Sequence, residues 1–389
     1  MDNKIVVIGA DHHNTLGVVE SFGLKGINSY VILFSPHSQG YVLHSKFVID
    51  GWCCCDEQSV IDCLLTHFTD CNNKAVIVAT NDIVACIIDR NHSFLINNFL
   101  IPSVKPYGNL STVMSKENMS ELARYVGLDV PKTWVVNEKR LHNDLEFPVI
   151  TKAISSVEGT KENIRVCIDN EQLNDFLSIN ERCHSIQIQK FIDKEYEFQL
   201  LGCSINSGEE VLIPGRTNII RPNGLDNTFF LSFDKCEPEL SETLLKAVNF
   251  VKLTQYTGLF SIEFLHDKSS GRNYFTEMNF RNDGNAICVT KAGTNLPYIY
   301  YLSMIGSDYK NEINNSNIKK IYLVPEVYYF SRFVAGEFGF GEWVKNMRKA
   351  NCYTTFFKND ITPFFWFIWL AIKKRLFNFN VFHNRKSLH

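Results

Sequence analysis

Short apolar runs alternate with helical patterns through the first part of the chain. The run Lys4–Ile8 is followed by a helical pattern that continues to Leu24. Similar apolar runs cover Ser29–Phe34 and Ala75–Ala79. Strands that alternate with helices in this way are typical of βαβ units and a mostly parallel sheet. We therefore predict a parallel α/β domain over residues 1–110.

Polar loops follow two of these predicted strands. Ligands of parallel sheets bind beyond the carboxyl ends of the strands, so we expect both loops to lie near a site. The adjacent histidines could be metal ligands, but histidines in loops are more often solvated or structural. The glycine pattern is not GxGxxG, so the dinucleotide-binding fingerprint is absent. The loop residues are Asp11, His12, His13, Asn14, Thr80, Asn81 and Asp82.

Helical and strand patterns are mixed from residue 111 onward, which predicts an α+β region. Residues 111–128 read as a helix, with Ser115 near its start and Gly127 at its end as caps. Residues 155–163 form a polar turn that contains a single glycine. We predict helices over 171–179 and 238–253, and strands over 147–152, 164–168, 185–192, 195–201, 258–265 and 272–279.

The last two of these strands carry an unusual row of polar side chains. Glu277, Asn279 and Arg281 stand at every second position and share one strand face, with apolar residues opposite. A short turn joins this strand to the one that contains Glu263, so an antiparallel pair could bring two carboxylates together. Like charges side by side are unfavourable unless a cation lies between them. The pattern therefore predicts a Mg²⁺ site, although an edge hairpin with solvated charges is the simpler alternative.

Two lysines and one strand pair complete a candidate site for a magnesium-bound nucleotide. Lys116 at a helix start and Lys152 at a strand end are candidate phosphate ligands. The strand pair over residues 185–201 offers a hinge and an apolar pocket for a purine. The candidate groups there are the backbone of Lys190, Phe191 and Ile192 for the base edge, the Gln189 side chain facing the base, and the Glu197 or Glu195 carboxylate for the ribose hydroxyls.

Composition narrows the class of protein. A chain of 389 residues is long enough for two or three subdomains, and its net charge of −3 gives no support for nucleic-acid binding. The start of the chain reads directly as a strand rather than as a signal peptide. Twelve cysteines are present without a CxxC pair, and we interpret Cys53–Cys55 as a strand edge or loop. We expect free, mostly buried thiols in a reducing cytoplasm.

Residues 361–377 differ from the rest of the chain. An aromatic and aliphatic run is followed by Lys373, Lys374 and Arg375, and the run is too short to span a bilayer. One interpretation is an interfacial helix that makes peripheral membrane contact. The other is a helix docked on the core or on a partner subunit, as in a homodimer.

The order of these motifs resembles the ATP-grasp superfamily of carboxylate–amine ligases, of the D-aspartate-ligase or carbamoyl-phosphate-synthase type. The resemblance covers roughly residues 1–305, and EMNFR paired with the upstream SIEF is its most specific element. It implies a Rossmann-like parallel-sheet domain over 1–110 and an ATP-grasp domain over 111–305, with a small lid at about 131–195. Residues 306–389 would be a C-terminal extension.

The resemblance also implies roles for individual residues. ATP and Mg²⁺, or Mn²⁺ in its place, would be the cofactors. Arg281 would stabilise the transferring phosphoryl group, and Arg216 and Arg221 would hold the acid substrate. Only Gly159 stands in a loop that many members make glycine-rich, and Gln189 stands where many have Glu. The implied phosphate ligands are Lys116 and Lys152, the metal ligands are Glu263, Glu277 and Asn279, and the residues that meet the amine are Asn282, Asp283 and Asn285.

The implied reaction joins a small-molecule carboxylate to an amine through an acyl phosphate, with ATP converted to ADP. The alternative is a degenerate nucleotide-binding module that senses or scaffolds. Within ligases, three directions stay open: addition of an amino acid to a cell-wall peptide, amidation of a sugar acid in surface-polysaccharide assembly, and formation of small peptides. The aromatic and basic segment favours the first two, whose acceptors can be lipid-linked.

Overall fold

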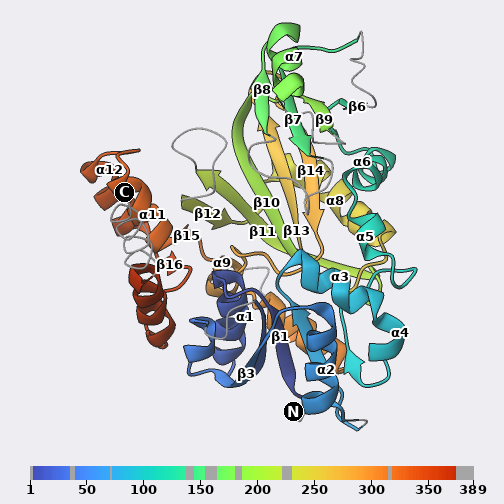
Figure 1. Cartoon of the computed structure of the whole chain (residues 1–389), viewed down its shortest axis with the longest axis vertical. Helices are drawn as coiled ribbons and strands as arrows, with labels where there is room; N and C mark the ends of the chain where they lie inside the picture. Colours follow the sequence, from blue (N-terminus) through green and yellow to red (C-terminus); the bar gives the residue numbers. More distant parts are fainter. Residues whose placement is uncertain are drawn as a thin grey trace, which may run out of the picture.

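Three sheets follow one another along the long axis of the molecule (Figure 1). This computed structural model describes residues 3–35, 40–70, 72–136, 144–153, 164–179, 186–220, 230–313 and 318–373. The N-terminal sheet lies at one end, a large central sheet occupies the middle, and a small sheet, here called the lid sheet, lies at the other end. Helices pack against the first two sheets, as expected for the predicted mixture of α/β and α+β structure.

The N-terminal sheet is parallel, as the alternating pattern predicts. Its strand order is β3-β2-β1-β4-β5, and the entirely buried β1 pairs with both β2 and β4. Strand β3 ends within Cys53–Cys55, which we interpreted as a strand edge or loop, whereas helix α2 was not predicted. The bounds are β1 Ile5–Gly9, α1 His13–Gly23, β2 Ser29–Phe34, β3 Val48–Cys54, α2 Glu57–Phe68, β4 Ala75–Ala79, α3 Asp82–Arg90, α4 His92–Leu95 and β5 Phe99–Leu100.

Capping side chains fix the two polar loops at the carboxyl edge of this sheet. His12 Nδ1 accepts the Asn14 N–H at 3.2 Å and begins α1. Asn81 Oδ1 accepts the Val84 N–H at 2.8 Å and begins α3. Each strand therefore passes into its helix through a short loop in which one polar side chain satisfies a free N–H group of the first helical turn.

The helix predicted over 111–128 is divided into two. Helix α5 spans Leu110–Val113 and α6 spans Lys116–Tyr125. Ser115 is extended, and its hydroxyl accepts the Asn118 N–H at 3.2 Å. Because Ser115 caps a new helix rather than lying inside a long one, Lys116 is placed in the first turn of α6.

The lid sheet is antiparallel with the order β6-β9-β7-β8. Trp134, Val149, Phe176 and Ile188 belong to a small core of its own beneath α7. The bounds are β6 Thr133–Val136, β7 Val149–Ala153, β8 Arg165–Cys167, α7 Asn170–Ile179 and β9 Ile186–Lys190.

The central sheet has seven strands in the order β14-β13-β10-β11-β12-β15-β16. One face carries Phe198, Leu200, Ile262 and Phe264, which pack in a core with Phe250 of α8. The opposite face faces the lid sheet. The bounds are β10 Lys194–Ile205, β11 Glu210–Ile220, β12 Phe230–Asp234, α8 Ser241–Leu253, β13 Gly258–Asp267, β14 Asn273–Asn279, α9 Ile287–Ala292 and α10 Leu296–Met304.

A register shift in the β13–β14 pair decides which side chains reach the open face. Glu263 pairs with Glu277, but the next residue, Phe264, pairs with Phe275, so Thr276 is an extra residue in β14. Its hydroxyl donates to the Glu263 carbonyl oxygen at 2.9 Å. A bulge of this kind reverses the alternation. Phe275 therefore lies in the core while Glu277 lies on the open face.

The C-terminal region extends the central sheet. Strand β15 (Ile321–Val324) pairs with β12, and β16 (Cys352–Tyr353) pairs with β15. Helices α11 (Glu326–Val334) and α12 (Phe340–Lys349) lie between them, and a last helix covers 362–373. None of the helices that the structure describes has the length and apolar character needed to cross a bilayer.

The buried carboxyl groups of Glu20 and Asp360 link the C-terminal region to the N-terminal domain. The side chain of Glu20 on α1 is hydrogen-bonded to that of Asp360. Asp360 also accepts the Ser45 hydroxyl and the Lys46 N–H. Burial and the neighbouring Asp360 raise the pKa of Glu20 to about 9, against the opposing effect of Lys291 and Lys46. Glu20 is therefore protonated at neutral pH and donates to Asp360.

Glu20 should make the stability of the protein depend on pH. The pKa of Glu20 is about 9 in the folded state and near 4.5 in the unfolded state. Between these two pH values the folded state therefore binds one more proton than the unfolded state. The free energy of unfolding should therefore fall as the pH rises between these values. Glu20→Gln keeps a neutral donor and should flatten this slope in urea melts between about pH 5 and about pH 8. Equal slopes for the variant and the wild type would contradict the assignment.

Candidate functional site

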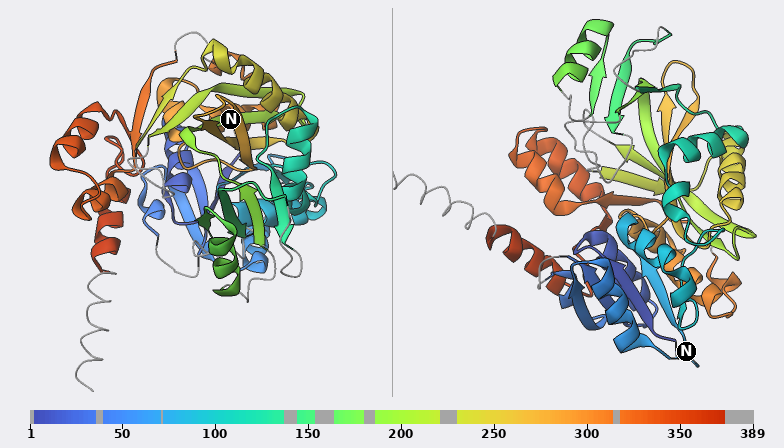
Figure 2. Two further views of the ribbon diagram at one scale, coloured as in Figure 1. Left: turned by 90° about the horizontal axis from the view of Figure 1, so that it is seen from above. Right: turned by 45° about the vertical axis from the view of Figure 1, so that its right-hand side comes forward.

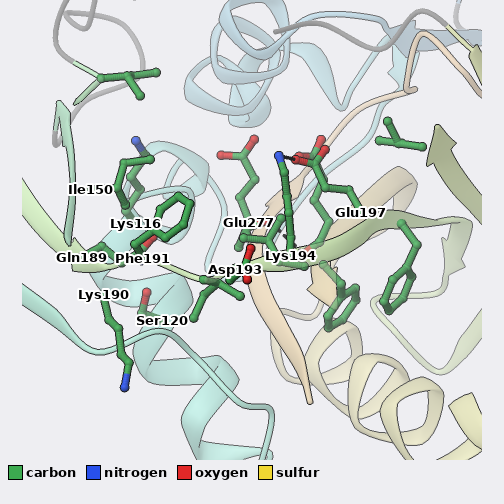
Figure 3. A pocket seen from close by; sticks show the side chains of 18 of the residues that line it. Lys116, Ser120, Ile150, Gln189, Lys190, Phe191, Asp193, Lys194, Glu197 and Glu277 are labelled. Carbon is green, nitrogen blue, oxygen red and sulfur yellow. Dashed lines mark hydrogen bonds and ion pairs between the residues drawn. The ribbon is translucent and has the colours of Figure 1, made fainter. Parts of the chain in front are cut away.

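A cavity of about 560 Å³ lies between the lid sheet and the open face of the central sheet. Figure 3 shows its lining, with Lys116 beside Ile150 and Phe191 on one side, and Glu277 and Glu197 across from them. Eight of the residues predicted from the sequence line it together. They are Lys116, Gln189, Lys190, Phe191, Ile192, Glu197, Glu263 and Glu277.

The segment that joins β9 to β10 forms the lid side of the cavity. The Lys190 N–H donates to the Lys132 carbonyl oxygen at 2.8 Å, and the Phe191 N–H donates to that of Pro148 at 3.0 Å. The Ile192 N–H has no acceptor within the described part of the chain. Of these three N–H groups, the one at Ile192 is therefore the one left for a ligand.

Charged side chains from three elements surround this segment. Lys116 and Ser120 reach the cavity from α6. Lys194 and Glu197, at the start of β10, form an ion pair, and both line the cavity. Lys190 differs from them, because its Nζ pairs with Glu146 at 3.0 Å and points away from the other lining side chains (Figure 3).

The Glu263–Glu277 pair is the electrostatic centre of the site. The two residues are direct cross-strand partners, and both line the cavity. Glu263 Oε1 accepts from Gln199 Nε2 at 3.1 Å and from Asn279 Nδ2 at 3.4 Å. Burial raises the pKa of Glu263 to about 8, and the carboxylates of Glu277 and Asp283 add to this. Because the neutral amide donors do not offset the repulsion between two charged carboxylates, Glu263 holds a proton at neutral pH until a cation takes its place.

The donor set at this pair fits a hard divalent cation. Two carboxylates and the Asn279 amide oxygen are the oxygen ligands that Mg²⁺ prefers, with substrate phosphates and water completing its shell. Within the described residues there is no group of three or more His, Cys, Asp or Glu side chains that could hold a metal. The candidate is therefore this mixed set, and the His12–His13 pair is not part of such a cluster.

Arg281 lies where the strand β14 meets the N-terminal domain. Its guanidinium contacts Asp82 through Nε and Asp283 through Nη1, each at 3.3 Å. The Asn282 N–H donates to the Ala79 carbonyl oxygen, and Asn14 Nδ2 donates to the carbonyl oxygen of Asn282 at 2.6 Å. The polar loops after β1 and β4 thus meet the segment after β14.

The histidines of the first loop are held beside this segment. Their rings lie 3.8 Å apart, and a Cβ on Gly284 would come within 2.7 Å of His13 Nε2. Burial lowers the pKa of His13 to about 3 and also lowers the pKa of His12. Both rings are therefore neutral at pH 7.

Arg216 is not brought to the cavity, contrary to its predicted role in holding the acid. It lies on β11 opposite Leu200, on the face that packs against the core, and its Nη2 pairs with Glu237 at 2.6 Å. The alternation along β11 explains this placement, because Thr217 rather than Arg216 shares the open face with Gln199. Arg221, residues 155–163 and the Lys152 side chain lie outside the described residues.

The fold is shared with solved enzymes of low sequence identity. No family model matches the chain, and the search of curated proteins found no match. The L-amino acid ligase from Bacillus licheniformis is 15% identical, with a TM-score of 0.63 over 82% of this chain and 79% of the ligase. The ADP complex of N5-carboxyaminoimidazole ribonucleotide synthetase is 13% identical, with a TM-score of 0.65 over 86% and 85%.

A third solved structure has both a nucleotide and a metal in its description. It is the biotin carboxylase domain of 2-oxoglutarate carboxylase from Hydrogenobacter thermophilus, in complex with MgADP, ADP and bicarbonate. It is 16% identical, with a TM-score of 0.63 over 82% of this chain and 73% of that one. The chain has the ATP-grasp fold. The fold class predicted from the order of the sequence motifs is thereby confirmed.

One residue that lines the cavity and contacts Glu263 was missed in the sequence. Gln199 donates to Glu263 and accepts from Asn285 Nδ2 at 3.0 Å, so it connects the carboxylate pair to the segment after β14. It lies two residues after Glu197 on β10 and therefore shares its face. The two-residue spacing from Glu197 could have pointed to Gln199. It places Gln199 beside Glu263, however, only if β10 pairs with β13, and the sequence does not show that pairing.

The Gln199 bridge should couple the two sides of the site. Gln199→Leu removes the best donor to Glu263 and should lower the free energy of unfolding by about 1–3 kcal/mol. Asn285→Ala removes the other end of the bridge. In a double-mutant cycle measured by urea unfolding, the two changes should be non-additive by at least about 0.5 kcal/mol. Additive effects would show that Gln199 does not connect the two residues.

Proposed function

We propose that the protein is an ATP- and Mg²⁺-dependent ligase that joins a carboxylate to an amine. The observation that carries this proposal is the Glu263–Glu277 pair, with Asn279 beside it, facing a cavity that also receives Lys116. The three solved enzymes support it, since one is named a ligase and two contain ADP. Mn²⁺ fits the same donor set.

The nucleotide would lie between the lid sheet and the central sheet. The Ile192 N–H would donate to the edge of the base, and Phe191, Ile150 and Leu265 supply apolar lining. Gln189 lines the cavity beside this segment and would face the base. Glu197 would accept from the ribose hydroxyls, with its ion pair to Lys194 fixing the position of the carboxylate.

The phosphates would extend from this pocket toward Glu277. Lys116 supplies a positive charge from the first turn of α6, and Lys152 on β7 is proposed as a second phosphate ligand. Glu263, Glu277 and Asn279 would hold Mg²⁺, which neutralises phosphate charge when bound. Positive charge aimed at the transferring group is the main catalytic term for such a reaction.

Arg281 and the segment after it would receive the reacting groups. The substrate carboxylate oxygen attacks the γ-phosphorus, the bond to the β-phosphate bridging oxygen breaks, and ADP leaves. The amine nitrogen then attacks the acyl carbon, phosphate leaves, and the amine loses a proton. Arg281 would stabilise charge in both steps, while Asn282, Asp283 and Asn285 would meet the amine.

The proposal extends to where the enzyme works. We place it in the cytoplasm, with peripheral membrane contact through residues 361–377, and a homodimer is compatible with the fold. Cell-wall peptide extension, sugar-acid amidation and small-peptide formation stay the candidate reactions. The free cysteines of the described residues support a reducing compartment.

Lys116 should bind phosphate rather than base. Lys116→Ala should weaken ATP binding about 10- to 100-fold, because a charge-assisted contact is lost, and leave adenosine binding unchanged. Lys190→Ala is the matched control, since the Lys190 amine pairs with Glu146 outside the cavity. Isothermal titration of both ligands would check this. An equal loss for ATP and adenosine would refute the phosphate contact.

The metal ligands should be required for turnover but not for folding. Glu277→Gln and Asn279→Ala should each reduce ADP release from Mg-ATP by about 100-fold or more. Glu239→Gln makes the same change at an exposed carboxylate outside the cavity and should have no effect. Circular dichroism and urea melts would verify that each variant is folded. Full activity of either metal-site variant would refute the metal assignment.

The ligase reaction itself is tested by ADP release when pairs of candidate acids and amines are added to enzyme and Mg-ATP. Amino acids, peptides and sugar acids are the acids to screen, with amino acids as the amines. A productive pair gives one ADP and one phosphate per amide. Tight Mg-ATP binding with no release for any pair would instead favour the sensor or scaffold interpretation.

A further inference from the structure

The last helix of the described chain has an apolar surface on both sides. Residues 363–372 contain no polar side chain. On the inner side, Trp366 stacks on His44 with ring centroids 3.9 Å apart, and Phe367 contacts Tyr41 at 4.8 Å. A helix that is apolar all round is expected to be surrounded by other groups. Here only the inner half is covered by the N-terminal domain.

The outer side of this helix is open to solvent. Phe365, Trp369 and Ile372 are 59%, 45% and 53% exposed. Their spacing of four and three residues places them in one stripe along the helix. We call Phe365, Trp369 and Ile372 the outer stripe. Figures 1 and 2 show the helix at the outer edge of the molecule, beside the N-terminal domain and far from the lid sheet.

Positive charge accompanies the outer stripe. No Asp or Glu follows Asp360, although the whole chain has a net charge of −3. Lys373 ends the described helix, and its Nζ lies 4.8 Å from the Trp369 ring centroid. All charged side chains after Asp360 are basic: Lys373, Lys374, Arg375, Arg385 and Lys386.

We infer that the outer stripe and its basic residues form a docking surface for an anionic lipid bilayer. This inference rests on the peripheral membrane contact proposed above. It adds which lipid surface is bound, which side of the helix faces it and which residues make the contact. Aromatic and aliphatic side chains on one helix side, with Lys373 beside Trp369 and further basic residues following in the sequence, suit the boundary between headgroups and acyl chains. The outer stripe offers no acceptor for the hydrogen bonds of a polar protein partner, whereas basic residues attract anionic headgroups.

The two halves of the surface can be removed separately in the full-length protein. One variant combines Phe365→Ser, Trp369→Ser and Ile372→Ser, and the other combines Lys373→Gln, Lys374→Gln and Arg375→Gln. Neither touches Trp366 or Phe367, so the inner side stays packed. Phe94→Ser, at an exposed aromatic on α4, is the matched control. Urea melts would verify that the variants fold.

Binding is measured by cosedimentation with vesicles of phosphatidylcholine and phosphatidylglycerol in equal parts, and with vesicles of phosphatidylcholine alone. The wild type and Phe94→Ser should bind only the first, and added salt should weaken binding. The charge variant should bind on the order of 100-fold more weakly, since each basic residue near such a surface contributes. The stripe variant should lose binding to a similar extent while keeping its salt dependence.

Three results would overturn the inference: no binding of the wild type to anionic vesicles, equal binding to both vesicles, or unchanged binding of both variants. The other possible occupant of the outer stripe is a second copy of the chain, and light scattering tests for it. A wild type that is dimeric and does not bind vesicles, with a stripe variant that is monomeric, would assign the outer stripe to a dimer contact. The ligase proposal is judged independently, because ADP release from soluble substrates needs no vesicles and should be unchanged in both variants.

Discussion

The repulsion between Glu263 and Glu277 is the constraint around which the rest of the site is organised. Their strands place the two carboxylates opposite one another, where like charges are unfavourable. Gln199 and Asn279 donate to Glu263, but both donors are neutral, and Arg281 is already held by Asp82 and Asp283. The site is therefore short of positive charge at its centre. Binding of the proposed cation and its phosphates would recover the stability that is lost through this repulsion.

Holding the carboxylates in this position requires both the bulge and the N-terminal domain. The extra residue Thr276 lets Phe275 enter the core without turning Glu277 away from the cavity. The segment after β14 is then fixed to the N-terminal domain through Asn282 and Asn14. Two of the proposed metal ligands, Glu277 and Asn279, and the groups proposed to meet the amine therefore belong to one continuous stretch of chain, so a nucleotide and a second substrate would be positioned by the same strand.

The parts of the site that the sequence could predict are those decided by local pairing. Glu263 and Glu277 lie on strands joined by a short turn, so their alternation and an antiparallel pairing are enough to place them together. Gln199 and Arg216 lie on long strands whose neighbours are distant in sequence, and their faces depend on register. The division of the predicted helix at Ser115 could not be predicted either, because a serine can cap a helix or lie within one. Lys116 was nevertheless assigned to a helix start.

The C-terminal helix shows why composition could not decide between a docked and an interfacial helix. An all-apolar helix satisfies both descriptions, and only its packing shows which half is covered. Trp366 and Phe367 attach the helix to the N-terminal domain, and the buried Glu20–Asp360 pair holds the chain just before it. The last helix is thus firmly attached to the N-terminal domain. A bilayer that held the outer stripe would hold the molecule by this end, leaving the lid sheet at the opposite end of the long axis free to admit nucleotide (Figure 1).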